Sequence, residues 1–159
     1  MGFSGLLLLA RSEDPLADLP SVSHLEVEER KLEGSWRAGQ IKRDFTDPEA
    51  LAAALVRYTG SPALAAYVFD SDFAQVNIDS PGGVRHWFYV DNTTAVASFE
   101  PWDDPPEPPS DEETVALVQQ WAAEAGLETD DNEILFALQQ YPPGEGIDDL
   151  YRALGVMPR

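Results

Sequence analysis

The stretch from residue 63 to residue 90 constrains the fold most, because it reads as three short strands joined by two tight turns. Residues 63–69 are a continuous apolar run, and two further runs rich in apolar residues cover 73–79 and 84–90. The segments between them, Asp70-Ser71-Asp72 and Ser80-Pro81-Gly82-Gly83, have the composition of hairpin turns. We therefore expect an antiparallel meander with residues 63–69 as an interior strand.

The register of the last two strands decides which side chains share a face. Closing the second turn with Asp79 opposite Val84 pairs Val76 with Trp87 and Asn77 with His86. This register predicts that one face carries the polar set together with one phenyl ring: Gln75, Asn77, His86 and Phe88. A slip of one residue would reverse the faces of one strand relative to the other.

The remaining N-terminal segments predict one more helix and several strands. Asp47 as N-cap, Pro48 at the first helical position and Gly60 as the stop define a helix. Residues 3–10 read as a strand that is buried on both faces, and residues 24–45 as an edge hairpin that turns near Ala38-Gly39. A last short strand is expected at 95–99.

Five prolines in nine residues mark a connector at 101–110, and the chain beyond it is helical in pattern. Ser110 and Glu113 form a capping box, and two further apolar stripes at helical spacing follow. We therefore predict an α+β fold, with a mostly antiparallel sheet of four to six strands and one packed helix. The sheet and this helix would form a domain of residues 1–100, and an acidic helical segment at 111–159 would dock on the sheet.

The charge is extreme and unevenly distributed. The chain has a formal net charge of −19, and residues 100–159 carry 15 acidic and only 2 basic side chains. Such a polyanion repels phosphate backbones and anionic lipid headgroups, so we expect neither nucleic acid nor a membrane as partner. A basic protein is the partner that this charge favours, although acid-rich faces also serve solubility alone.

The chain has no cysteine, which excludes disulfides, thiolate metal sites and cysteine nucleophiles. The leucine run at residues 6–9 is too short for a spanning helix and follows no basic residue. We expect a cytoplasmic protein. No phosphate loop, dinucleotide fingerprint or serine-nucleophile elbow occurs, and no cofactor is predicted.

Three carboxylates form the one candidate metal site. Asp70 and Asp72 follow an interior strand at a spacing of two, and Asp79 ends the next strand. Carboxylate oxygens of this kind hold Mg²⁺ or Mn²⁺, yet Asp and Ser are also ordinary turn residues. In the register above, His86 lies beside Gln75 and Asn77, where an imidazole that titrates near neutrality would complete a polar pocket.

Two aromatic residues are candidate contacts for a partner. Phe88 would mark a contact surface if its face of the sheet were uncovered. Trp102 lies in the proline-rich connector beside Asp103 and Asp104, where it either fastens the connector to the domain or anchors a partner.

Three stretches carry a resemblance: Gly2-Phe3-Ser4-Gly5-Leu6, Pro62-Ala63-Leu64-Ala65-Ala66-Tyr67-Val68 and Phe69-Asp70-Ser71-Asp72. They look like stretches of a group of uncharacterised small acidic proteins from high-GC Gram-positive bacteria. The resemblance brings no known activity. In size and charge the chain is also similar to immunity proteins that neutralise basic toxins. The sequence thus favours a non-catalytic acidic module that binds a basic protein. The alternative is a small metal-dependent enzyme or ligand-binding protein that uses the Asp70, Asp72, Asp79 and His86 region.

Overall fold

The computed structural model describes residues 4–20, 22–42, 46–69, 73–104, 107–139 and 143–157. Side chains are described for all of these except residues 92–93 and 143–146. The element bounds and contacts below refer to this part of the chain.

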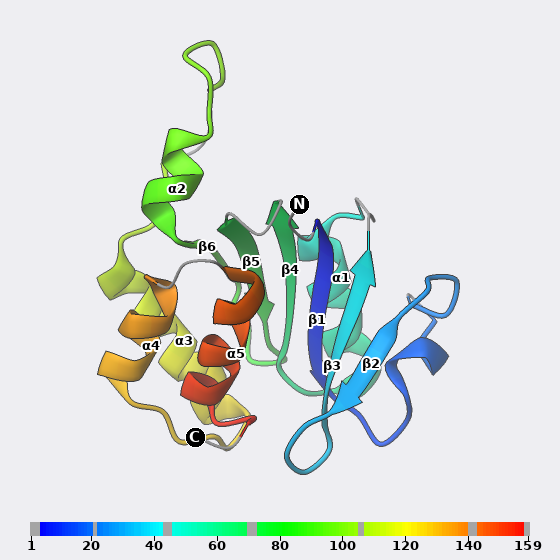
Figure 1. The fold of residues 1–159 in the computed structure, drawn as a ribbon. Helices are drawn as coiled ribbons and strands as arrows, with labels where there is room; N and C mark the ends of the chain where they lie inside the picture. Colours follow the sequence, from blue (N-terminus) through cyan, green and yellow to red (C-terminus); the bar gives the residue numbers. More distant parts are fainter. Residues whose placement is uncertain are drawn as a thin grey trace.

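Six strands form one sheet in which every neighbouring pair is antiparallel. In the order in which they lie across the sheet (Figure 1), they are β2 (Glu28–Lys31), β3 (Trp36–Lys42), β1 (Gly5–Arg11), β4 (Ala63–Phe69), β5 (Phe73–Asp79) and β6 (His86–Val90). The predicted α+β class is therefore confirmed. So is the meander, because β4, β5 and β6 are neighbours in both sequence and space.

The helices cover both faces of this sheet (Figure 1). They are the short 3-10 helix η1 (Leu16–Asp18), α1 (Pro48–Thr59), α2 (Asn92–Ala97), α3 (Asp111–Glu124), α4 (Asp131–Leu138) and α5 (Pro143–Leu154). The caps of α1 are as predicted: the Asp47 side chain accepts a hydrogen bond from the Glu49 N–H, and Gly60 is left-handed at φ 67°. No helix in the described ranges is long and apolar enough to cross a membrane.

Strand alternation divides the buried side chains into two layers. Leu6, Leu8 and Ala10 of β1 face η1 and α1. Leu7 and Leu9 of the same strand face the opposite layer, which includes Trp121 of α3 and Leu150 of α5. We call the first face the α1 face and the second the α5 face. β1 is therefore apolar on both faces because both are covered.

Two predicted elements are wrong. The turn of the N-terminal hairpin lies at residues 32–35, with Gly34 at φ 61°, and Gly39 is inside β3 opposite Glu29. Gly39 is small for a packing reason, since an added Cβ would lie 2.8 Å from Cγ1 of Val27. The expected strand at 95–99 is instead α2, whose first turn is capped by the Asp91 side chain through the Thr94 N–H.

The predicted register of β5 and β6 is wrong by one residue. Val76 lies opposite Phe88 and Asn77 opposite Trp87. The cause is the loop before β6: the Ser80 hydroxyl accepts from the Val84 N–H at 2.9 Å, which keeps Val84 out of the strand. The slip moves His86 and Phe88 to the α5 face, and it leaves Asn77 and Gln75 on the α1 face.

Candidate functional site

The proposed metal ligands are only partly within the described chain. Asp70 and Asp72 lie outside the described residues. Asp79 is 6% exposed, and its Oδ1 accepts from the Ser80 N–H while its Oδ2 pairs with Arg85 at 3.2 Å. Across the described residues, no three His, Cys, Asp or Glu side chains gather as a metal site would require. Asp79 therefore closes a loop and holds a guanidinium.

His86 lines a small cavity together with Asn77, whereas Gln75 is not part of its lining. The His86 ring packs toward α3, where Nε2 lies 3.0 Å from the Thr114 hydroxyl. Burial lowers the pKa of His86, because it disfavours the imidazolium, and the Glu113 carboxylate opposes this effect in part. The imidazole joins the sheet to the first turn of α3.

Asn77 lies on the α1 face and is 5% exposed. Its Nδ2 has no hydrogen-bond partner in the described chain. The residue lines this cavity, of about 80 Å³, together with His86, Ala52 of α1 and Trp87. A cavity of this size has room for a water molecule that would satisfy the amide.

The two aromatic candidates differ completely in exposure. Phe88 is 2% exposed and belongs to the core between the sheet and the C-terminal helices, so it presents no contact surface. Trp102 is 80% exposed. It lies in the segment after α2, which projects away from the sheet in Figure 1. Asp103 and Asp104 beside it are exposed, and Asp103 accepts the Glu100 N–H at 2.9 Å to form a local turn.

The helical layer carries most of the exposed carboxylates. Between residues 100 and 139 the chain has 12 acidic side chains and no basic one. Most of the acidic residues described there are exposed, including Glu112 at the start of α3 and Glu128 after its end. Phe136 of α4 adds a second exposed ring, at 61%. We call α3, α4 and the described residues before them, 100–104 and 107–110, the acidic layer.

A groove of about 400 Å³ lies between the β2 end of the sheet and α5. The sequence did not indicate it. Its lining combines apolar residues from β1, β3 and α5 with polar residues from β2, β3 and α5: Leu7, Ala38, Ile147 and Tyr151, and Glu28, Arg30, Gln40 and Asp148. In the sequence, only the charged residues at 28–31 bear on the groove, because the alternation of a strand places Glu28 and Arg30 on one face.

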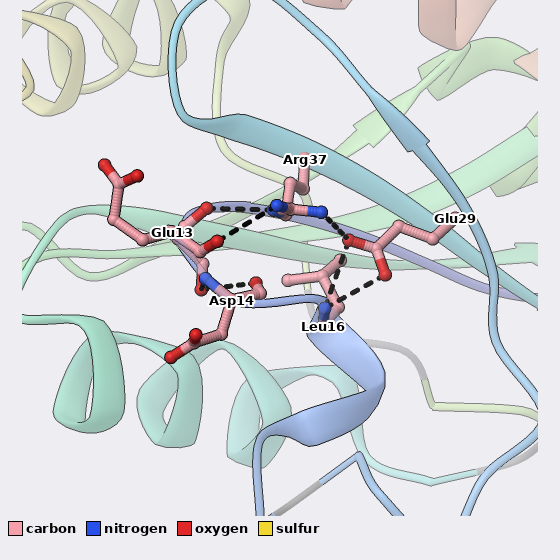
Figure 2. Close-up of polar contacts among 6 residues, drawn as sticks. Glu13, Asp14, Leu16, Glu29 and Arg37 are labelled. Carbon is pink, nitrogen blue, oxygen red and sulfur yellow. Dashed lines mark hydrogen bonds and ion pairs between the residues drawn. The ribbon is translucent and has the colours of Figure 1, made fainter.

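The β2 strand that forms one wall of the groove is fixed from its other face. Figure 2 shows Glu29 between Arg37 and the backbone of Leu16. The Glu29 carboxylate pairs with Arg37 at 3.0 Å and accepts the Leu16 N–H, while Arg37 also donates to the carbonyl of Glu13 at 3.1 Å. The side chains of Glu29 and Arg37 are both mostly buried, so these hydrogen bonds hold β2 in position beside the groove.

An ion pair joins the two sides of the groove. Arg30 of β2 donates to Oδ1 of Asp148 on α5, and the guanidinium lies 6.0 Å from the centre of the Tyr151 ring. Tyr151 is 1% exposed, and its hydroxyl has no hydrogen-bond partner in the described chain. Burial raises the pKa of Tyr151 far above its usual value, so the phenol stays protonated.

Comparison with protein-family models, with curated proteins and with solved structures gave no significant match.

Proposed function

We propose that the chain is a non-catalytic binding module for a basic protein, of the immunity, antitoxin-like or regulatory kind. The observation that carries the proposal is the acidic layer, which carries most of the exposed carboxylates and two exposed aromatic rings, Trp102 and Phe136. Clustered charge of one sign raises the rate of encounter with a partner of the opposite sign. Large aromatic side chains supply the apolar contacts that slow dissociation.

The metal-dependent alternative has less support. Asp79 is committed to Ser80 and Arg85, and His86 is committed to Thr114. The described residues contain no cluster of three or more His, Cys, Asp or Glu side chains that could hold a metal ion.

The test compares two pairs of neutralised carboxylates. The partner is first captured from a native extract on the immobilised chain and identified, and its affinity is then measured with purified protein. Glu112→Gln with Glu128→Gln removes two exposed charges from the acidic layer. Asp18→Asn with Glu26→Gln removes two exposed charges elsewhere and is the matched control.

At low ionic strength we expect the first pair to lower affinity about tenfold, mainly through the association rate, and the control pair to change it less than about twofold. Trp102→Ala should lower affinity at least about tenfold through faster dissociation. Near 0.5 M salt the two charge pairs should become alike, because the screening length falls to a few ångströms. Equal effects of both pairs at low salt, or an affinity that ignores salt, would overturn the proposal.

A further inference from the structure

The groove between β2 and α5 has the dimensions and the lining of a small-molecule site. Its volume of about 400 Å³ falls within the usual range of roughly 300–1,000 Å³. Leu7, Ala38 and Ile147 give it an apolar floor, and each of these side chains is at most 8% exposed. A few polar groups at the rim would then fix the orientation of a ligand.

The rim presents both signs of charge in direct contact. The Arg30–Asp148 pair is partly exposed, with 47% and 31% of the two side chains accessible. An exposed pair of this kind contributes little to stability, so rearranging it costs little. Within the described chain Arg30 uses a single N–H in this pair, which leaves the rest of its guanidinium for a ligand.

Tyr151 supplies an independent sign of a ligand. Its hydroxyl is buried and has no partner among the residues that the structure describes, a state that is unfavourable and uncommon in native structures. The Arg30 guanidinium lies 6.0 Å from the centre of the Tyr151 ring, and Tyr151 lines the groove together with Arg30 and Asp148. A ligand that enters under the pair would give the hydroxyl an acceptor.

We propose that the groove binds a free α-amino acid with an apolar side chain. Arg30 and the Tyr151 hydroxyl donate to its carboxylate, while Asp148 accepts from its ammonium group with Glu28 nearby. The ligand side chain lies on the apolar floor. Because Arg30 and Asp148 are in contact, they favour a ligand whose carboxylate and ammonium groups are adjacent. In a free α-amino acid both groups are bonded to the same carbon, whereas in a peptide they lie at opposite ends of the chain.

The net charge of the protein does not oppose this ligand. A zwitterion carries no net charge, so the surplus of −19 neither attracts nor repels it strongly. The site is also independent of the proposed protein partner, because Glu28 and Arg30 belong to β2, at the sheet edge opposite β6 (Figure 1).

The experiment titrates the intact chain with L-leucine by calorimetry and by NMR. We expect saturable binding with a Kd of about 1 mM or lower. Three control compounds each remove one feature: 4-methylpentanoate lacks the amine, 3-methylbutylamine lacks the carboxylate and glycine lacks the side chain. A fourth, N-acetyl-leucinamide, lacks both charges. Each should bind at least about tenfold more weakly, since each forfeits one group of contacts.

Two variants and one control locate the site. Arg30→Gln should weaken L-leucine binding at least about tenfold, and Tyr151→Phe, which removes only the unpartnered hydroxyl, by about threefold or more. Arg85→Gln breaks a different arginine–aspartate pair and should leave binding unchanged. Far-UV circular dichroism confirms that each variant is folded. The proposal is overturned if L-leucine does not bind at about 10 mM, if N-acetyl-leucinamide binds equally well, or if Arg30→Gln binds like the wild type.

Discussion

Trp121 gives the sharpest test of how the acidic layer is attached to the sheet. Its side chain on α3 is fully buried, and its ring centre lies 5.8 Å from that of Trp36 on β3. The indole Nε1–H donates to the carbonyls of Ala63 at 3.1 Å and Asp79 at 2.9 Å, at the ends of β4 and β5. One side chain thus joins α3 to three strands.

The Trp121→Phe substitution isolates these contacts. Loss of the larger ring should cost about 1–2 kcal/mol in transfer and cavity terms. Loss of the indole donor leaves two buried carbonyls short of a hydrogen bond, which costs about 1–3 kcal/mol more. We therefore expect the free energy of unfolding to fall by about 2–5 kcal/mol. That is a large part of the roughly 5–15 kcal/mol that a domain of this size has.

Urea unfolding followed by far-UV circular dichroism measures this difference, with an unchanged m-value as the check that the native fold persists. Trp102→Phe is the matched control. Because Trp102 is 80% exposed, this change should stay within about 0.5 kcal/mol of wild type. If Trp121→Phe cost less than about 1 kcal/mol, α3 would not be packed on the sheet as described.

Two further predictions concern His86 and Asp91. Because burial lowers the pKa of His86 in the folded state, the unfolded chain binds the proton first as the pH falls. The free energy of unfolding should therefore decrease below about pH 6.5. In urea midpoints measured between pH 7.5 and 5.5, His86→Gln should show a smaller decrease than the wild type. Asp91 has a φ of 66°, and its side chain accepts hydrogen bonds from the Thr94 N–H and hydroxyl. By the same measurement, Asp91→Ala should lower the free energy of unfolding by about 1–2 kcal/mol and Asp91→Asn by clearly less. Equal losses in the two variants would contradict the capping role.

The sequence predicted those parts of the fold that depend on short-range interactions. The bounds of α1 follow from Asp47, Pro48 and Gly60, which act within one turn of each helix end. The register of β5 and β6 did not follow, because it depends on how Ser80 hydrogen-bonds the loop and not on the apolar pattern. A pattern of period two tolerates a slip of one residue wherever both faces are covered, as they are here.

The candidate sites were harder to predict for a related reason. The sequence left open whether Trp102 fastens the connector to the domain or stands exposed, and the structure shows it 80% exposed. The groove could not be anticipated, since Arg30 and Asp148 are 118 positions apart and meet only when α5 lies across the β2 end of the sheet. The buried Tyr151 reads in sequence as an ordinary member of an apolar stripe. Its unpartnered hydroxyl is a property of the assembled core alone.

The edge strand β2 shows how one short charged segment can serve two purposes. An edge strand is a template for unwanted pairing, and charged side chains are a common protection against it. In β2 the alternation sends Glu29 to the α1 face, where Arg37 and the Leu16 N–H hold it, and sends Glu28 and Arg30 to the groove. Edge protection by itself would leave such charges solvated on both sides. Because one side is instead locked into a mostly buried ion pair, the strand itself is held in place. Its other side presents Arg30 with Asp148 above an apolar floor, where the two opposite charges can recognise a ligand.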